Sequence, residues 1–487
     1  MPDTKYSGFF CGLIFNSEHM EYQFITNQKT LLADTVTPVS IYLRLRDQFP
    51  NSLLLESSEY HTRDNNMSYI CCQPIAGIVA EKELLKTEFP DGKKESKKIS
   101  KGELRQEISD FRKKFKACDS LKNSAVLSNG LFGYFTYEAI EHFEDITLNA
   151  QADPEREIPM MQYHIYRYVI AIDHFHNRLH IFENLLENEQ SSLDEISGMI
   201  QNKNFPEYNF SITSKEESNR TDQEHKDLVE KLVGHIRQGE VFQIVPSRAF
   251  KLSFKGDEFN VYRALRSINP SPYLFYFDYG SFRLFGSSPE AQITIKNEEA
   301  TIYPIAGTFK RTGDIKEDLR IAEELKKDPK EKAEHVMLVD LARNDLSRHC
   351  SNVQVESYMK AQFYSHVIHL VSKVTGSLHQ DVASFEVVAD TFPAGTLSGA
   401  PKYRALELID QYEGKSRSFY SGSIGFMGFQ QEFNHAIMIR SFLSKQNLLH
   451  YQAGGGIVLD SDPEKELQEV NNKIAALRKA IEAAETM

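Results

Sequence analysis

The chain has 487 residues, of which 41% are hydrophobic and 26% are charged. This composition is ordinary for a folded globular protein and excludes wholesale disorder. The 69 acidic and 56 basic residues give a net charge of −13 at pH 7. Because affinity for phosphate backbones and anionic lipids comes mostly from lysine and arginine, we expect no nucleic-acid partner and no membrane partner.

Targeting and redox features favour a cytoplasmic protein. No apolar run approaches the roughly 18 residues that a membrane helix needs. The apolar segment 8–15 is short and lacks a small-residue cleavage site, so no signal peptide is expected. The cysteines include no CxxC pair, which predicts neither a zinc site nor a redox motif and fits a reducing compartment. They are Cys11, Cys71, Cys72, Cys118 and Cys350.

Residues 1–210 are expected to form an N-terminal region of short strands and helices. Apolar runs such as 39–45 alternate with polar breaks, and the segments 163–172 and 179–182 are typical of strands. The lysine-rich stretch 91–103 predicts a solvated loop.

The polar segment 211–223 is the expected boundary, and residues 220–482 are expected to form a second domain. Long amphipathic helices such as 225–237 alternate there with strands such as 283–285 and 424–429. This mixture, without regular βαβ alternation, predicts an α+β fold with antiparallel strands. An N-terminal strand that joins the sheet of the second domain would shift these limits.

Two predicted helices of the second domain carry carboxylates that suit a hard cation. Helix 328–348 places Glu331 and Glu334 on one face, because they are three positions apart. Helix 460–480 adds Glu469 beside an apolar stripe. Magnesium commonly uses one or two carboxylates together with water and an anionic substrate. Viewed alone, each acidic face is more simply explained by solvent-exposed charges.

Three segments with glycines, 304–313, 395–402 and 452–460, suit anion binding. Backbone N–H groups of such loops and of helix N-termini hold oxyanions, and glycine lets the backbone approach a ligand closely. In the second segment Pro401 is expected near the first helical position, with Ser398 or the following glycine as the cap. Neither a Rossmann nor a P-loop fingerprint is present. A plain helix start and a flexible turn remain the alternatives.

Three further side chains fit the same site. Arg440 follows a strand-like segment, where its guanidinium can hold a carboxylate, and Tyr420 can donate to the same group. His369 can act as an acid or a base, although a histidine among apolar residues is more often a satisfied core side chain. Together these residues predict magnesium-dependent chemistry on a small dicarboxylate.

The second domain also carries a series of motifs in a fixed order. They are PIAGT (304–308), EHVMLVDLARND (334–345), GTLSGAPK (395–402), YSGSIGF (420–426), IRS (439–441) and QAGGGIVLDSDPEKE (452–466), preceded by LLES (54–57) and NPSPYLFYF (269–277). This series resembles the chorismate-utilising enzyme family and, within it, the component I branch of anthranilate synthases most. The resemblance implies an α+β sandwich of two orthogonal antiparallel β-sheets flanked by helices.

The resemblance also assigns roles to individual residues. It implies that Glu334 and Glu469 bind Mg²⁺, with Glu331 close by. It implies that Glu290 is the acid beside the departing C4 hydroxyl of chorismate and that His369 takes part in pyruvate elimination. The implied chorismate contacts are Gly307, Thr308, Thr396, Tyr420, Arg440, Gly454, Gly455, Gly456 and Lys473.

The implied reaction has two steps. Ammonia adds to C2 of chorismate while the C4 hydroxyl leaves, and the enolpyruvyl group then departs as pyruvate, with His369 as the candidate for the second proton transfer. Gln243 stands where isochorismate and salicylate synthases carry a water-activating lysine. Ala306 stands where aminodeoxychorismate synthases carry a lysine proposed as a covalent nucleophile. Both differences favour amination at C2 and hence anthranilate, the first step of tryptophan biosynthesis.

The nitrogen source and the regulation follow from the same comparison. No cysteine lies in a glycine-rich nucleophile elbow, so we expect ammonia from a separate glutamine amidotransferase subunit, in a heterotetramer of two large and two small subunits. The resemblance places an inhibitory L-tryptophan site on Ser57, Pro272, Tyr273 and Leu274. Two alternatives remain, which are component I of an aminodeoxychorismate synthase of the folate pathway and a non-catalytic tryptophan-binding scaffold.

Overall fold

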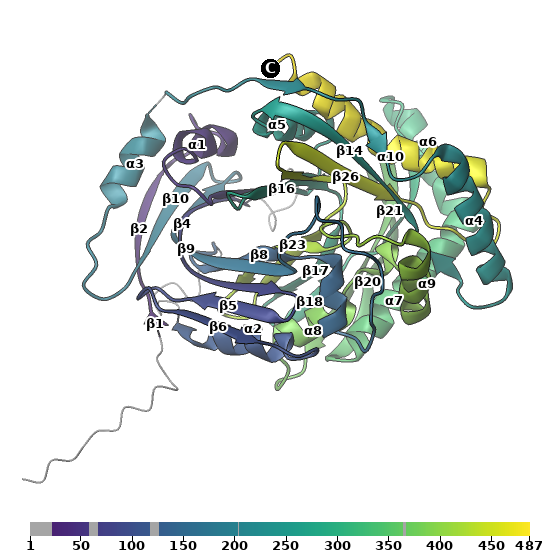
Figure 1. Ribbon diagram of the computed structural model, residues 1–487, viewed down its shortest axis with the longest axis horizontal. Coiled ribbons are helices and arrows are strands. Elements are labelled where there is room, and N and C mark those ends of the chain that lie inside the picture. The colour runs from purple at the N-terminus through teal and green to yellow at the C-terminus, as the bar shows by residue number, and fades with distance from the viewer. Residues whose placement is uncertain (1–21, 58–66, 117–125, 203, 364–366) are drawn as a thin grey trace, which may run out of the picture.

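The computed structural model describes residues 22–57, 67–116, 126–202, 204–363 and 367–487 (Figure 1). Its α-helices are α1 (Pro38–Leu45), α2 (Leu104–Lys113), α3 (Leu193–Gln201), α4 (Asp222–Arg237), α5 (Phe259–Ile268), α6 (Ile315–Lys327), α7 (Pro329–Ser347), α8 (Ser384–Thr391), α9 (Lys402–Glu413) and α10 (Pro463–Ala484). A short 3₁₀ helix, η3, covers Gly395–Leu397.

The strands that build the sheets are β2 (Ile25–Leu32), β3 (Leu53–Glu56), β4 (Met67–Glu81), β5 (Leu84–Glu88), β6 (Lys94–Lys98), β8 (Gly130–Phe135), β9 (Met161–Asp173), β10 (Arg178–Leu185), β14 (Ser247–Gly256), β15 (Tyr273–Asp278), β16 (Phe282–Ser288), β17 (Ala291–Lys296), β18 (Glu299–Ile302), β19 (Ile305–Lys310), β20 (Cys350–Phe363), β21 (Val367–Leu378), β23 (Ser423–Gly428), β24 (Phe433–Ile437), β25 (Ser441–Lys445) and β26 (Leu448–Gly454). A separate two-stranded pair joins β13 (Gln243–Ile244) to β22 (Gly399–Ala400).

These strands form two antiparallel sheets that share the long strands β4 and β9. The first sheet has the order β2-β10-β9-β4-β3-β15-β16-β25-β26-β14. The second has the order β6-β5-β4-β9-β8-β23-β24-β17-β18-β21-β20. The register of β4 against β9 shifts between Pro74 and Ala76, so the two sheets meet at a bulge in the shared strands.

Side chains that alternate along each strand build three apolar layers. Leu274 and Tyr276 of β15 belong to the core packed against α1, α5 and α10, whereas Phe275 and Phe277 belong to the core between the sheets. The second sheet contributes to that inner core and packs its other face on α2, α8 and α9. In Figure 1, α5 and α10 lie along the top and α2 and α8 along the bottom. The predicted sandwich flanked by helices is confirmed.

The predicted helices of the second domain are confirmed as α4, α7 and α10. Helix α4 begins at Asp222, earlier than the apolar periodicity indicates, because Thr221 and Glu224 form a reciprocal capping box. The sequence pattern Thr-x-x-Glu was the signal for this earlier start. Strands of the N-terminal region pair with strands of the second domain, namely β3 with β15 and β8 with β23.

The prediction for the lysine-rich stretch 91–103 was wrong, because it contains a strand. Residues Lys94–Lys98 form β6, which pairs with β5 at the edge of the second sheet, and all five side chains are exposed. Lysines on an exposed edge strand oppose pairing with a second chain. The charge density of the segment therefore reflects an edge strand rather than a loop.

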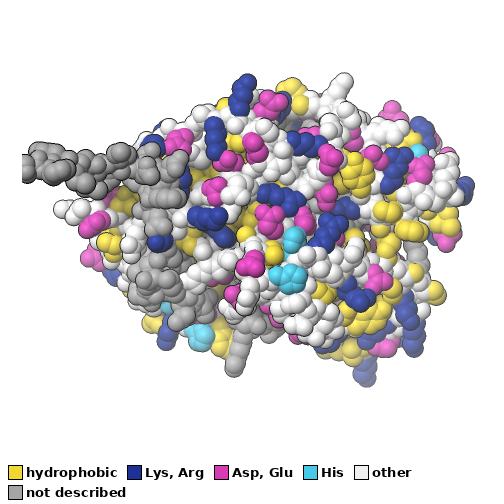
Figure 2. Space-filling model, turned by 90° about the horizontal axis from the view of Figure 1, so that it is seen from below, with side chains coloured by type: hydrophobic (Ala, Val, Ile, Leu, Met, Phe, Trp, Pro, Cys, Tyr) yellow, Lys and Arg dark blue, Asp and Glu magenta, His cyan; other side chains and the backbone are white. Residues whose placement is uncertain are grey.

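Figure 2 shows one face of the molecule, where basic and acidic side chains are interspersed rather than separated by sign. The net charge of −13 is thus not gathered into one acidic field on this face. In the part of the chain that the structure describes, no helix is long and apolar enough to cross a membrane.

Candidate active site

The residues predicted for the site converge where β26 ends and α10 packs beside it. Lys473 of α10 connects them, because its Nζ lies 2.8 Å from the carbonyl oxygen of Gly454 and 2.8 Å from Oε1 of Glu469. The charge of Lys473 also acts on Glu290 and on His369. Side chains from α10, β21 and the loop between β16 and β17 therefore share one location.

Two of the three consecutive glycines lie where a side chain would crowd its neighbours. A Cβ on Gly454 would lie 2.5 Å from the carbonyl oxygen of Pro246 and 3.1 Å from the hydroxyl of Tyr420. A Cβ on Gly456 would lie 2.5 Å from Nε2 of Gln243, so that side chain would have to move. Gly454 is required here by the close approach of the Pro246 carbonyl group, which argues against the alternative of a merely flexible turn.

The same glycines bring two of the predicted metal ligands together. The Cβ position of Gly455 lies 3.5 Å from Oε1 of Glu469, and that of Gly456 lies 3.7 Å from Oε1 of Glu334. Gln243 donates from Nε2 to Oε1 of Glu334 at 3.2 Å. Carboxylates from α7 and α10 therefore face the same two-residue stretch of backbone.

The third predicted carboxylate, Glu331, lies next to another glycine. Its Oε2 is 3.0 Å from the Cβ position of Gly307, which has a φ of +75° at a bulge in β19. Among the residues that the structure describes, no three histidine, cysteine or acidic side chains are grouped closely enough to hold a metal ion by themselves. The carboxylate oxygens of Glu334 and Glu469 fit magnesium, which typically completes its shell with water and substrate oxygens.

The surroundings of Glu290 raise the pKa of its carboxylic acid. Thr396 in η3 donates its hydroxyl to Oε1 of Glu290 at 3.0 Å. Burial raises the pKa of Glu290 to about 7, and the Thr396 hydrogen bond and the charges of Lys473 and Arg440 oppose this rise. A substantial fraction of Glu290 is therefore protonated at neutral pH, as a general acid requires.

The surroundings of His369, in contrast, lower the pKa of its imidazole ring. Its Nδ1 lies 3.0 Å from the carbonyl oxygen of Gly307, and since a carbonyl only accepts, Nδ1 carries the proton. Burial lowers the pKa of His369 to about 4, and the cationic Arg440 and Lys473 lower it further. His369 is neutral at pH 7, with Nε2 as its basic nitrogen. The structure describes the backbone of Thr308, which pairs with His369 across β19 and β21.

Tyr420 and Arg440 come from the ends of two strands of different sheets. Tyr420 is buried just before β23, with its hydroxyl beside Gly454. Arg440 immediately precedes β25 and has a φ of +49°, an uncommon conformation for a non-glycine residue. Its backbone carbonyl accepts from the N–H of Ser287, which fixes the turn beside the loop that carries Glu290.

The predicted cap of the helix after Thr396 was wrong. Helix α9 begins at Lys402 with Pro401 as its N-cap, and no side chain caps it. Ser398 instead donates its hydroxyl to the carbonyl oxygen of Ala394, a local hydrogen bond that competes with capping. The close spacing of serine, glycine and proline permits either arrangement, so the sequence did not decide between them.

The residues predicted to bind tryptophan lie at the paired ends of β3 and β15. Leu274 is paired with Glu56, which brings Ser57 opposite the N-terminal end of β15, where Pro272 and Tyr273 lie. Leu274 is buried, and Tyr273 is half-buried. The segment 58–66, which continues this motif, lies outside the described residues.

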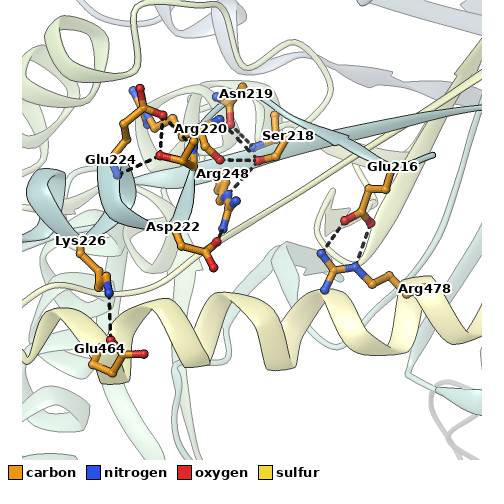
Figure 3. A network of polar contacts seen from close by, with 12 residues as sticks. Glu216, Ser218, Asn219, Arg220, Asp222, Glu224, Lys226, Arg248, Glu464 and Arg478 are labelled. Atoms are coloured by element: carbon orange, nitrogen blue, oxygen red, sulfur yellow. Dashed lines mark hydrogen bonds and ion pairs between the residues drawn. The ribbon is translucent and has the colours of Figure 1, made fainter.

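A polar network behind α10 was not found from the sequence (Figure 3). Arg478 of α10 binds Glu216 through two hydrogen bonds of 2.8 and 2.6 Å, and Lys226 of α4 lies 3.1 Å from Glu464 of α10. Arg248 of β14 lies 2.6 Å from Asp222 at the start of α4. The network ties α4 and β14 to the helix that carries Glu469, but its charges follow no local pattern in the sequence.

Known proteins share the sequence pattern and the fold of this chain. The sequence profile of the family described as chorismate binding enzyme matches residues 29–479. The chain belongs to this family. It is 36% identical over 489 residues to a protein named anthranilate synthase component 1 from Aquifex aeolicus, covering 95% of this chain and 96% of that relative. It is also 36% identical to a protein of the same name from Mycolicibacterium smegmatis, covering 97% and 94% of the two chains.

Solved structures show the same fold. Anthranilate synthase component I from Streptococcus pneumoniae superposes with a TM-score of 0.74 at 29% identity, covering 93% of this chain and 100% of that one. The menaquinone-specific isochorismate synthase from Escherichia coli superposes with a TM-score of 0.70 at 20% identity, covering 96% of each chain. The second likeness extends to the fold alone.

We expect His369 to titrate near pH 4 and to carry its proton on Nδ1 at pH 7, because burial and the hydrogen bond to Gly307 fix this state. NMR of protein labelled with ¹⁵N-histidine, with the signal assigned by the His369→Gln variant, measures both properties. A titration near the ordinary value of about 6.5 would contradict the assignment.

Proposed function

We propose that this chain is component 1 of an anthranilate synthase, which converts chorismate and ammonia to anthranilate and pyruvate. The relatives of that name, at 36% identity over almost the whole chain, support the proposal. The observation that carries it is the buried amide of Gln243 beside Glu334. Its Oε1 has no hydrogen-bond partner among the described residues, so it can accept an N–H from ammonia. An amide cannot deprotonate water, which disfavours hydration of chorismate.

The charge states of the site suit both steps of this reaction. Protonated Glu290 can donate its proton to the C4 hydroxyl as that group leaves, and the hydrogen bond from Thr396 orients it. Neutral His369 can accept the C2 proton through Nε2 as the ring becomes aromatic. The ether bond from the ring to the enolpyruvyl oxygen then breaks, and the methylene carbon takes up a proton, so that pyruvate departs. Arg440 and Lys473 supply positive charge for the two carboxylates of chorismate.

Magnesium is part of this proposal. Glu334 and Glu469 would hold the ion beside the glycines 454–456, and Glu331 lies nearby, next to Gly307. The ion would neutralise a substrate carboxylate and polarise the leaving oxygen.

The proposal includes a separate glutaminase subunit as the source of ammonia, and a cytoplasmic location. The described cysteines, Cys71, Cys72 and Cys350, are free and buried. Burial raises the pKa of the Cys350 thiol to about 11 and raises that of Cys71 well above its ordinary value. Such thiols are poor nucleophiles, so none of the three serves as a glutaminase cysteine. The heterotetramer of two large and two small subunits remains a proposal.

The function is tested by incubating the purified chain with chorismate, MgCl₂ and an ammonium salt at alkaline pH, without glutamine. Growth of anthranilate fluorescence that EDTA stops supports the proposal. Consumption of chorismate without fluorescence points to aminodeoxychorismate or isochorismate, and no consumption points to a scaffold without chemistry. Ala306 in β19 lacks a nucleophile for the covalent route to aminodeoxychorismate, so we expect fluorescence.

Glu334→Ala and Glu469→Ala should each abolish magnesium-dependent turnover, because each removes a carboxylate facing the proposed metal position. Calorimetric titration of Mg²⁺ in the presence of chorismate should show the same loss. Glu464→Ala is the matched control, since Glu464 is on α10 but is exposed and paired with Lys226. Rates like those of the unaltered chain in both test variants would remove the metal assignment.

The rate should depend on the protonation of Glu290. At a constant concentration of unprotonated ammonia, kcat/KM for chorismate should fall as the pH rises above about 7. Thr396 donates to the carboxylate and stabilises its charged form, so Thr396→Ala should raise the pKa of Glu290 and move the falling limb to higher pH. A limb that stays in place, or moves to lower pH, would contradict the role of Glu290.

Feedback inhibition by L-tryptophan is the remaining part of the proposal, and its residues are Ser57, Pro272, Tyr273 and Leu274 at the paired ends of β3 and β15. Ser57→Ala should weaken inhibition and leave activity without tryptophan unchanged. Ser281→Ala, at the exposed opposite end of the β15–β16 hairpin, should leave inhibition unchanged. Full inhibition of the Ser57 variant would place the sensor elsewhere.

A further inference from the structure

A closed ring of buried polar side chains lies behind the glycines of the site. Arg417 binds Glu413 through Nη2–Oε1 and Nε–Oε2 hydrogen bonds of 2.7 and 2.9 Å, and Ser247 donates its hydroxyl to Oε1 of Glu413 at 2.7 Å. Gln452 donates to the Ser247 hydroxyl at 2.6 Å and accepts from Arg156 at 2.6 Å. Arg156 closes the ring by donating to the carbonyl oxygen of Arg417 at 2.7 Å.

Arg417 forms hydrogen bonds to three chain segments that surround the site, which are called its walls below. Its Nη1 donates to the carbonyl oxygen of Leu397 at 2.8 Å and lies 3.2 Å from the hydroxyl of Ser421. Its Nη2 donates to the carbonyl oxygen of Val245 at 2.7 Å. Leu397 follows Thr396, Ser421 follows Tyr420, and Val245 lies two residues after Gln243. A guanidinium holds its donors in one rigid plane, so this side chain fixes the relative positions of the three segments.

The other members of the ring connect to a fourth wall, which is the end of β26 at Gly454. Ser247 is paired with Gly454 across β14 and β26, and Gln452 lies two residues before that glycine. Arg417 exposes only 2% of its surface, and the side chain of Glu413 exposes 6%. A buried ion pair contributes little net stability compared with apolar packing, so its value lies in the arrangement it enforces.

We propose that Arg417 is a positioning residue of the active site, which sets the spacing of Thr396, Gln243, Tyr420 and Gly454 around the substrate. This inference rests on the proposed function. Arg417 acts through carbonyl and hydroxyl groups of the walls. A lysine in its place keeps the charge but loses the planar fork, so it cannot hold all three walls in the same geometry.

The Arg417→Lys variant tests the inference. We expect kcat/KM for chorismate to fall about 100-fold, with a raised KM, because a displacement of about 1 Å at the walls has effects of this size. Arg46→Lys is the matched control, since Arg46 binds Asp257 through two hydrogen bonds and lies over the ring of Phe259 without contacting the site. The control should lose comparable thermal stability and keep its kcat/KM. Equal kinetic losses in the two variants would overturn the inference.

A second readout separates this inference from the proposed function. Chorismate should raise the melting temperature of the unaltered chain and of Arg46→Lys, but not of Arg417→Lys, when ammonia is absent. If the melting temperatures follow this pattern but no anthranilate forms, the proposed function is contradicted and the inference is not. If chorismate raises the melting temperature of all three proteins equally, the inference is contradicted and the proposed function is not.

A double-mutant cycle gives a third readout and protects the test against a folding failure. Arg417→Lys combined with Thr396→Ala should lose less activity than the sum of the single losses, because both changes release the same wall. Should Arg417→Lys not fold, Glu413→Gln removes the charge that orients Arg417 while keeping the side-chain volume. Additive losses, or full activity in folded Glu413→Gln, would contradict a positioning role.

Discussion

The backbone at Gly454–Gly456 lies close to its neighbours, most of all at Gly454, where the carbonyl oxygen of Pro246 leaves no room for a side chain. The rest of the site depends on this close approach. Two carboxylates from different helices, Glu334 and Glu469, face that short stretch of backbone. A side chain on Gly454 would clash with the Pro246 carbonyl and crowd the Tyr420 hydroxyl. A side chain on Gly456 would displace Gln243, which donates to Glu334. The two-sheet sandwich satisfies this constraint because it places β26, β13 and α10 around the same backbone segment.

Around this backbone, the site separates the pKa values of its two proton-transfer groups. Burial raises the pKa of Glu290 to about 7 and lowers that of His369 to about 4. Both groups are therefore neutral in a large fraction of molecules at pH 7, one as an acid and the other as a base. Paired groups driven apart by their environments are the usual basis for acid and base roles in one site. Arg440 and Lys473 act on both groups, so substrate carboxylates that bind these cations would alter both pKa values.

The sequence predicted the parts of the site that lie in short contiguous motifs. Glycine-rich segments, carboxylates at helical spacing and the helices that carry them follow from local patterns, and the structure brings them together. It did not predict the ring through Ser247, Glu413 and Gln452, because each member is an ordinary polar residue whose partner is distant in the chain. The lysine-rich strand β6 and the uncapped start of α9 were missed for a related reason. Pairing at a sheet edge and competition for hydrogen bonds are decided by tertiary contacts rather than by composition.

The measurement that tests the account most directly is the fate of the nitrogen atom. The chain is incubated with chorismate, MgCl₂ and ¹⁵N-ammonium, and the products are identified by mass spectrometry and ¹⁵N NMR. We predict anthranilate with one ¹⁵N atom on the ring and one molecule of pyruvate for each anthranilate. A labelled product that retains the enolpyruvyl group, or an unlabelled hydroxylated product, would contradict it.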